Sequence, residues 1–125
     1  MGKPGHSGMQ RIILATRFSA QGFLYAWKNE SAFRQEVAMS LVMTPAAFWL
    51  GRTATEVLML ILPLALVLIV ELLNSAVEAT VDRISDKKHE LAGGAKDMGS
   101  AAVLISLLVV AGVWTSVAWQ RFGPL

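Results

Sequence analysis

The sequence predicts an all-α membrane protein, with three transmembrane helices and an N-terminal amphipathic helix on the membrane surface. Three observations lead to this class. Hydrophobic residues make up 54% of the 125 residues and charged residues only 16%, whereas about 25% of an ordinary soluble domain is charged. Uncharged stretches recur along the chain, and the basic residues gather on one side of them. A soluble bundle of three buried helices is the alternative, but runs such as LMLILPLALVLIV leave no polar face for water.

Length and composition also exclude several classes of function. A chain of 125 residues is too short for a two-domain enzyme with its own nucleotide-binding fold. The absence of cysteine excludes disulfide scaffolds, zinc knuckles and cysteine nucleophiles. The net charge of +2 is too small to indicate nucleic acid as a partner.

The N-terminal part of the chain is predicted to contain a disordered segment and a surface helix. Residues 1–10 form the disordered segment, and residues 11–125 form a single membrane domain. Apolar and basic residues alternate loosely over about 11–28, which is typical of a helix lying on the cytoplasmic leaflet. Gly22 weakens this prediction, and a plain connecting segment is the alternative.

Three uncharged stretches mark the transmembrane helices. They contain 14, 14 and 23 residues and cover 37–50, 57–70 and 98–120. Only the third is long enough by itself for a hydrocarbon core of about 30 Å. The other two reach this length only if their helices continue through polar residues, so we predict spans over about 33–51, 56–82 and 97–120. Pro45 and Pro63 fall inside the first two, where neighbouring helices can satisfy the backbone groups that a proline frees.

The placement of Lys and Arg predicts the orientation in the membrane. Nine of the 11 basic residues lie either in residues 1–36 or in residues 82–97. The positive-inside rule assigns this side to the cytoplasm, so the N-terminus is cytoplasmic and the C-terminus lies outside. Trp27, Trp49 and Trp119 fall near the membrane boundaries, as interfacial aromatic residues do, whereas Trp114 lies somewhat inside its span.

A stripe of polar residues follows the second uncharged stretch. Spacings of 3, 4 and 4 place Glu71, Asn74, Glu78 and Asp82 on one face of a helix, with Ser75 beside them. A charged carboxylate toward the membrane interior costs about 2.5 to 3.5 kcal/mol, so a stripe of three acids with an amide indicates a function. Hydrogen bonding between helices, as oligomer contacts, is the structural alternative.

Two further polar clusters are expected at the same depth of the membrane. One covers residues 89–100 and leads into the third span, and the other covers residues 29–36 at the entrance of the first span. Together the three clusters contain the kinds of side chain that phosphoryl transfer requires. Glu30 and Glu78 can supply carboxylates to Mg²⁺, Lys96 can meet phosphate charge, and a partly desolvated Glu71 can accept a hydroxyl proton. No GxxxxGK[ST] or GxGxxG motif is present, so a nucleotide site must be built at the membrane surface.

Three ordered motifs closely resemble the prokaryotic integral-membrane diacylglycerol kinases. The motifs are Asn29–Glu36, Val70–Ile84 and Ala95–Val103, and the resemblance extends over about 11–119. It implies a homotrimeric bundle of three-span subunits whose active sites are shared between neighbours. It also implies a multi-pass protein of the bacterial inner membrane that transfers the γ-phosphate of ATP to the free hydroxyl of 1,2-diacylglycerol, with Mg²⁺, to give phosphatidic acid.

The resemblance also implies roles for individual residues. The catalytic positions are Glu71 as general base, Asn74 and Lys96. The metal-holding positions are Glu30 and Glu78. The positions that engage the nucleotide are Arg11, Phe18, Glu30, Glu78, His89, Lys96 and Asp97. The positions that bind the lipid substrate are Arg11, Ser19, Arg34, Gln35, Glu36, Glu71 and Ser100.

The sequence departs from the family at three positions. Phe18 stands where some relatives have tyrosine near the adenine, so stacking persists without a hydroxyl contact. Leu14 and Gly94 occupy positions that are basic in some relatives, which removes a phosphate or headgroup contact there.

Two other functions compete with this interpretation. The related undecaprenol kinases share the Glu-Leu-Leu-Asn and Lys-Asp motifs, but they follow Lys-Asp with Val-Ala-Ala-Gly, where this chain has Met98–Ala101. Val81-Asp82-Arg83 also favours the diacylglycerol branch. A small transporter with Glu71 as a proton-coupled acid is the alternative from a different class. Three spans, no inverted repeat and acids gathered at the membrane boundary argue against it.

Overall fold

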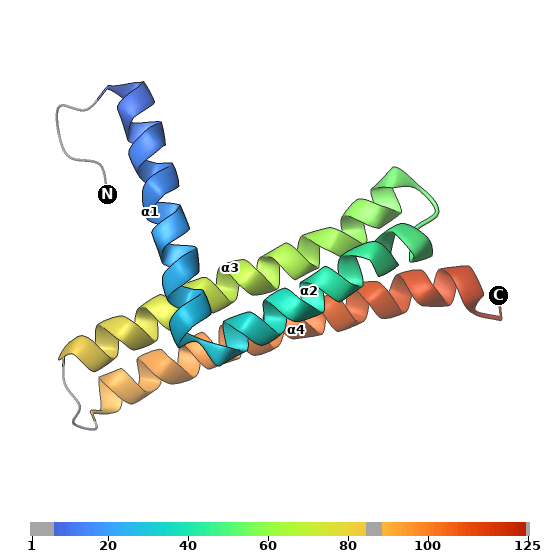
Figure 1. Ribbon diagram of the computed structural model, residues 1–125. Helices are drawn as coiled ribbons and strands as arrows, with labels where there is room; N and C mark the ends of the chain where they lie inside the picture. Colours follow the sequence, from blue (N-terminus) through green and yellow to red (C-terminus); the bar gives the residue numbers. More distant parts are fainter. Residues whose placement is uncertain (1–6, 85–88, 125) are drawn as a thin grey trace.

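The computed structural model describes residues 7–84 and 89–124, and the regular secondary structure within them is all α-helix. This confirms the predicted all-α class. The helices are α1 (Gly8–Asn29), α2 (Ser31–Leu50), α3 (Ala54–Ile84) and α4 (Glu90–Phe122). The last three form a bundle in which α3 is antiparallel to α2 and α4 (Figure 1). The helix α1 leaves this bundle near the start of α2 and points away from it (Figure 1).

The start of α1 corrects one boundary of the sequence analysis. Residues 8–10 belong to the helix, whereas the sequence predicts disorder over 1–10. The reason is a capping box: the Ser7 hydroxyl accepts a hydrogen bond from the backbone nitrogen of Gln10, and the Gln10 side chain accepts one from the backbone nitrogen of Ser7. Residues 1–6 lie outside the described residues.

Two short breaks separate α1 from α2 and α2 from α3. Glu30 alone interrupts the first pair, with extended backbone angles of φ −120° and ψ 104°. The second turn passes through Gly51, where a Cβ atom would stand 2.7 Å from the Val57 side chain. Only glycine therefore allows this close approach. After it, Thr53 accepts from the backbone nitrogen of Glu56 at 3.1 Å, and so caps the start of α3.

The core of the bundle lies between α3 and its two neighbours. One buried cluster joins α2, α3 and α4 through Ala47, Leu50, Leu60 and Val117. A second cluster contains Leu64, Val67 and Val110. Trp114 packs against both clusters, and its indole nitrogen donates to the carbonyl of Leu60 at 3.0 Å, three residues before Pro63 in α3. This buried hydrogen bond explains why Trp114 lies inside its span rather than at the membrane boundary.

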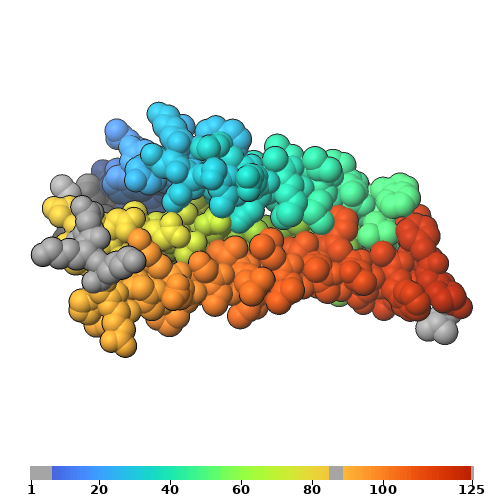
Figure 2. Space-filling model, turned by 90° about the horizontal axis from the view of Figure 1, so that it is seen from below, coloured from blue at the N-terminus to red at the C-terminus, as the bar shows by residue number. Residues whose placement is uncertain are grey.

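The outer surfaces of α3 and α4 are apolar and uncovered. Both helices are long and apolar enough to cross a membrane, yet only 28% and 17% of their most apolar windows are buried. On α3 the exposed residues form a stripe: Leu58, Leu62, Leu66, Ile69, Leu73 and Val77. Seen from below, α4 extends along the whole molecule and α2 lies beside only part of it (Figure 2). Such surfaces belong in lipid or against another chain, so the alternative of a soluble bundle is not supported.

The helix α2 is less clearly a transmembrane helix. Its 20 residues begin with Arg34, Gln35 and Glu36 within the first two turns, and these polar residues lower its mean hydropathy. Only α3 and α4 meet the criteria of length and composition for a span within the described residues. The three-span arrangement therefore remains a prediction.

Candidate active site

The polar stripe on α3 forms a continuous hydrogen-bonded group. The amide nitrogen of Asn74 donates to Oε2 of Glu71 at 3.4 Å and to Oε1 of Glu78 at 3.3 Å. The Ser75 hydroxyl donates to the same Oε2 of Glu71 at 3.3 Å. Glu71 is only 5% exposed, whereas Asn74, Ser75 and Glu78 are half-buried. The spacing read from the sequence thus produces one network, with the carboxylate of Glu71 at its buried end.

A second buried acid, Glu36 on α2, faces this network. Its side chain is 9% exposed and interacts with that of Glu71. Among the described residues, two buried side-chain oxygens have no hydrogen-bond partner, namely Oε2 of Glu36 and Oδ1 of Asn74. Buried polar atoms are seldom left unpaired, and those that are often mark a functional site. Both of these atoms belong to the predicted site.

The position of Asn74 depends on Gly99 of α4. A Cβ atom at residue 99 would clash with Oδ1 of Asn74. Gly99 therefore lets α4 approach α3 closely enough to cover the amide, whose nitrogen is then directed at the two glutamates. Gly99 is not among the site residues predicted from the sequence. The available signal was a glycine inside a predicted helix, which often indicates close packing.

Lys96 enters the site from α4. Its Nζ atom forms an ion pair with Oδ1 of Asp82 at 2.6 Å. This hydrogen bond raises the pKa of Lys96, which lies just outside the span predicted over 97–120, and Glu78 contributes in the same direction. Lys96 is therefore a permanent positive charge beside the acidic stripe. Asp82, which had been placed on the stripe without a role, is the residue that holds it there.

A groove between α3 and α4 opens beside Glu71. It has a volume of about 340 Å³, and its polar end is formed by Glu71, Asn74 and Ser100. Its other lining residues are apolar: Val103, Leu104 and Leu107. The groove thus extends from a buried carboxylate along an apolar helix surface. Ser100, a predicted lipid-binding residue, lies at this end of the groove.

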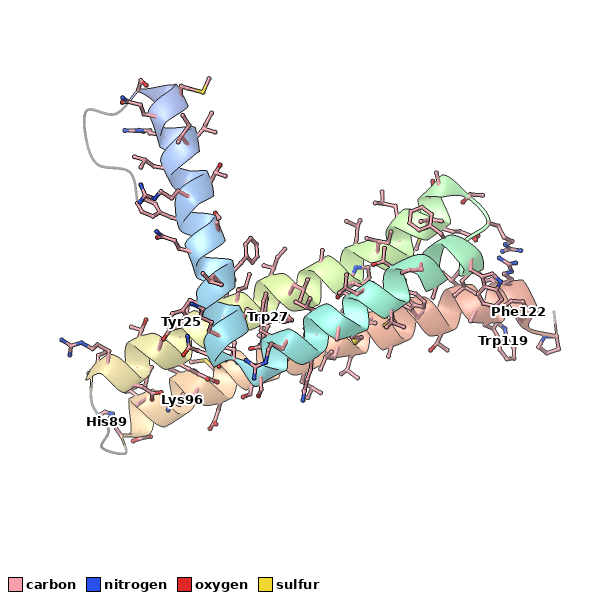
Figure 3. All side chains as sticks on the ribbon, in the orientation of Figure 1. Tyr25, Trp27, His89, Lys96, Trp119 and Phe122 are labelled. Carbon is pink, nitrogen blue, oxygen red and sulfur yellow. The ribbon has the colours of Figure 1, made fainter. Side chains whose placement is uncertain are left out.

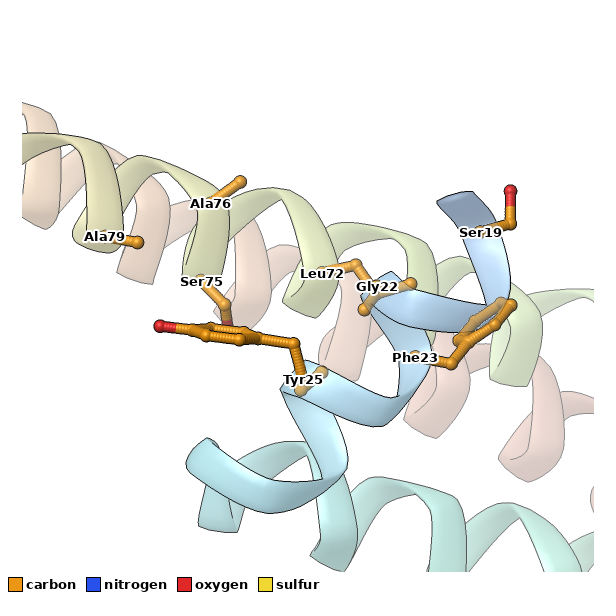
Figure 4. A pocket seen from close by; sticks show the side chains of 9 residues that line it. Ser19, Gly22, Phe23, Tyr25, Leu72, Ser75, Ala76 and Ala79 are labelled. Carbon is orange, nitrogen blue, oxygen red and sulfur yellow. The ribbon is translucent and has the colours of Figure 1, made fainter. Parts of the chain in front are cut away.

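A second cavity of similar volume lies between α1 and α3 (Figure 4). Ser19, Gly22, Phe23 and Tyr25 line it from α1, and Leu72, Ser75 and Ala76 from α3. Tyr25 lies beside Ser75 in this cavity (Figure 4). Ser75 therefore borders the cavity while its hydroxyl binds Glu71. Ser19, predicted to bind lipid, is on the cavity wall, and its hydroxyl donates to the carbonyl of Ala15 at 2.8 Å.

Other predicted site residues do not join the network within one chain. Arg11 and Phe18 are exposed on the part of α1 that points away from the bundle (Figure 1). His89 caps α4, where its Nδ1 atom accepts from the backbone nitrogen of Leu91 at 3.1 Å. His89 and Lys96 lie at the same end of the bundle, opposite Trp119 and Phe122 (Figure 3). Gln35 and Asp97 are exposed.

Arg34 and Glu30 lie at the junction of α1 and α2. The guanidinium of Arg34 donates to the carbonyl of Trp27 at 2.6 Å, so it fastens the end of α1 to the start of α2. Glu30 is half-buried at the break between these helices, and its side chain makes no capping hydrogen bond.

The two predicted metal residues fit Mg²⁺ by their chemistry. Within residues 7–84 and 89–124, no group of three or more His, Cys, Asp or Glu residues is arranged to hold a metal ion. Mg²⁺ does not need such a group, because it commonly takes one or two carboxylates together with water and substrate phosphates. The carboxylate of Glu78 accepts a single long hydrogen bond from Asn74, and that of Glu30 is not used for capping. Both therefore retain oxygen atoms for a cation.

Fold and site together define a helical membrane protein with a buried carboxylate at the polar end of an apolar groove. The sequence profile described as prokaryotic diacylglycerol kinase matches residues 17–118. The chain belongs to the prokaryotic diacylglycerol kinase family. This confirms the resemblance, and because the family consists of kinases, the alternative of a transporter is not supported.

Several relatives match nearly the whole chain. The diacylglycerol kinase of Escherichia coli strain K12 is 50% identical over 117 residues, which cover 94% of this chain and 96% of that protein. The diacylglycerol kinase of Haemophilus influenzae is 46% identical over 111 residues, covering 89% and 94%. A more distant relative, the diacylglycerol kinase of Helicobacter pylori strain 26695, is 41% identical over 119 residues, covering 95% and 89%.

Proposed function

We propose that the protein transfers the γ-phosphate of ATP to the free hydroxyl of 1,2-diacylglycerol and so produces phosphatidic acid and ADP. The observation that carries this proposal is the buried carboxylate of Glu71 at the polar end of an apolar groove, in a chain of the diacylglycerol kinase family. A lipid hydroxyl at this point is close to an acid, while its acyl chains remain among apolar side chains. The relatives' names support the same lipid substrate.

Glu71 is the general base in this reaction. Asn74 and Ser75 both donate to its Oε2 atom, so the side chain is held in one orientation. Its Oε1 atom remains to accept the proton of the lipid hydroxyl as the oxygen attacks the γ-phosphorus. The new bond is O–P, and the bond that breaks joins the γ-phosphorus to the oxygen of ADP.

Glu30 and Glu78 would hold Mg²⁺ together with the ATP phosphates. The bound ion would neutralise charge on the phosphates, as in other kinases. Lys96 supplies a further positive charge for the phosphates, and Asp82 fixes it beside Glu78. Asp97 follows Lys96 and completes the nucleotide end of the site, to which the family resemblance adds Arg11, Phe18 and His89.

The active protein is a homotrimer with active sites shared between neighbouring subunits. The uncovered apolar stripe of α3 supports this proposal, because it offers a surface on which a neighbouring subunit can pack. The position of Arg11 and Phe18 supports sharing, because both lie on α1, which points away from the bundle of α2, α3 and α4 (Figure 1). These side chains can therefore contribute to the active site of a neighbouring subunit.

The lipid is proposed to enter from the bacterial inner membrane, with the N-terminus in the cytoplasm where ATP is available. The distribution of Lys and Arg supports this orientation. Arg34, Gln35 and Glu36 on α2, with Ser100 on α4 and Ser19 on α1, border the lipid side of the site. Glu36 and Ser100 support this most directly, since they lie beside Glu71.

The test is transfer of radiolabelled phosphate from ATP by the purified protein in mixed micelles. Dioleoylglycerol and undecaprenol are offered separately, with and without Mg²⁺. We expect Mg²⁺-dependent labelling of dioleoylglycerol and much weaker labelling of undecaprenol. Preferential labelling of undecaprenol would replace the lipid substrate while retaining the chemistry, and transfer to neither lipid by a folded protein would contradict the proposed function.

A further inference from the structure

The direction of α1 is not set by packing against the bundle. Of the 22 described residues of α1, only Ala26 is buried. A cavity of about 340 Å³ lies between α1 and α3, so side chains do not fill the space between the two helices there (Figure 4). A membrane surface can hold the apolar side of α1, but it leaves the helix free to turn within the membrane plane. Within one chain, the direction of α1 therefore depends on its junction with α2.

The last carbonyl groups of α1 find hydrogen-bond donors at this junction. Glu30 alone separates the two helices, and the end of a helix leaves carbonyl groups without a partner inside the helix. The carbonyl of Ala26 accepts from the backbone nitrogen of Glu30 at 2.8 Å. The carbonyl of Tyr25 accepts from the side chain of Asn29 at 2.9 Å. Both of these donors are local, so they end α1 without joining it to α2.

The carbonyl of Trp27 is different, because its donor belongs to α2. The guanidinium of Arg34 donates to it at 2.6 Å. A charged donor makes a stronger hydrogen bond than a neutral one, and a positive charge is favourable at the C-terminal end of a helix. Among the described residues, Arg34 forms no ion pair that would compete with this bond. Its neighbour Phe33 is only 4% exposed, so the bond joins α1 to a packed part of α2.

Small rotations at the junction produce large displacements at the other end of α1. Arg11 lies 19 residues before Glu30, which is about 28 Å of helix at about 1.5 Å per residue. A rotation of about 10° at the junction therefore moves Arg11 by about 5 Å. A displacement of only about 1 Å can cost an enzyme about a hundredfold in rate. Any residue that α1 contributes to a nucleotide site thus depends on how the junction is held.

We propose that Arg34 is a positioning residue for α1, because its bond to the carbonyl of Trp27 sets the direction of the helix. In this way it places Arg11 and Phe18 at the nucleotide end of a neighbouring subunit's active site. This rests on the proposed function, in which these two residues engage ATP. Arg34 touches no reacting group in this role. The role differs from the lipid contact that the family resemblance implies for Arg34, because its loss weakens the use of ATP.

A distance measurement tests the direction of α1 without reference to activity. The chain has no cysteine, so Thr16→Cys on α1 and Thr80→Cys on α3 can each carry a nitroxide label, and both threonines are exposed. Labelled chains are assembled with an excess of unlabelled chain in nanodiscs, so that pulsed EPR reports distances within one subunit. We expect a narrow distance distribution for the labelled parent protein.

Three variants are compared in this labelled background. Arg34→Met keeps a long side chain without donors, and it should shift or broaden the distance distribution. Arg34→Lys keeps a charged donor and should give a distribution close to that of the parent. Lys28→Met is the matched control, because it removes an exposed positive charge from the last turn of α1 itself. It should leave the distribution unchanged.

Steady-state kinetics test the consequence for the nucleotide. At saturating dioleoylglycerol, KM for Mg-ATP should rise about fivefold to tenfold in Arg34→Met. It should change little in Arg34→Lys and Lys28→Met. Loss of a residue that only stabilises the bundle would lower the thermal unfolding temperature and leave this KM unchanged.

The outcomes separate the inference from the proposed function. An unchanged distance distribution in folded Arg34→Met would overturn the inference, and so would a rise in KM for the lipid alone. If Arg34→Met fails to fold, Arg34→Gln, which also lacks the guanidinium, is measured in its place. Absence of lipid phosphorylation by the wild-type protein would instead contradict the proposed function, while the distances would still test the direction of α1.

Discussion

At the end of the bundle where α2 turns into α3, Arg121 of α4 donates to the carbonyls of Trp49 and Leu50 at 2.7 and 2.8 Å. Its guanidinium lies 5.5 Å from the centre of the Trp49 ring and 5.2 Å from that of Phe122. Toward the other end, by contrast, buried oxygen atoms of Glu36 and Asn74 have no partner. Polar groups at the Arg121 end hold helices together by hydrogen bonds. Around Glu71, the unpaired buried oxygens lower the stability of the fold, because they lose their bonds to water without gaining others. From this contrast we predict that stability and catalysis depend on different ends of one bundle.

The largest effect is expected from removal of the base. Glu71→Gln retains the volume and the buried position but cannot accept a proton, so kcat should fall at least about a hundredfold. The helical content and the thermal unfolding temperature should stay close to those of the wild type. A variant that keeps substantial activity would show that the polar region lacks the catalytic role assigned to it.

A smaller effect is expected from the helix contact that positions Asn74. In Gly99→Ala the new methyl group displaces Asn74 and disturbs its bonds to Glu71 and Glu78, so kcat should fall about tenfold to a hundredfold. Gly112→Ala on the same helix is the matched control, because a Cβ atom there meets nothing within 4 Å. Equal kinetics for the two alanine variants would contradict the positioning of Asn74 by Gly99.

Loss of a metal-holding carboxylate should change binding more than chemistry. Glu78→Gln is expected to raise the dissociation constant of Mg-ATP at least about tenfold, measured by calorimetry with the detergent-solubilised protein. Glu30→Gln should act in the same direction, and Glu56→Gln, in the first turn of α3 at the other end of the bundle, is the control. Unchanged Mg-ATP affinity in both variants would refute the metal assignment.

The smallest effect on activity is expected at the Arg121 end. Arg121→Gln removes the two bonds to α2 carbonyls and the contacts with both rings, which should lower the free energy of unfolding by about 1 to 3 kcal/mol. The kcat of the folded fraction should not change. A marked loss of kcat, relative to the neighbouring exposed variant Gln120→Ala, would show that the two ends are coupled.

Local patterns in the sequence were sufficient to predict the helices and the stripe on α3. The hydrophobic runs predict α3 and α4, and the spacing of Glu71, Asn74 and Glu78 predicts their common face, because both depend only on helix geometry. The start of α1 was set too late, although Ser7 and Gln10 have the spacing of a capping box.

Contacts between helices could not be predicted in the same way. Gly99 lies in close contact with Asn74, and Glu36 lies near Glu71. Both contacts join residues that are distant in the chain. They depend on how deeply each helix packs against its neighbour, which periodicity does not specify. The hydrogen bond from Trp114 to Leu60 is of the same kind, since it joins α4 to α3 across 54 residues of the chain.

The central claim is that Glu71 takes the proton of the lipid hydroxyl, and a single-turnover experiment tests it most directly. Wild-type and Glu71→Gln proteins, saturated with radiolabelled Mg-ATP, are mixed with dioleoylglycerol and quenched at successive times. We predict that the wild type forms one phosphatidic acid per site, whereas Glu71→Gln binds ATP with similar affinity and forms product at least about a hundredfold more slowly. Product formation at the wild-type rate in Glu71→Gln would contradict the claim.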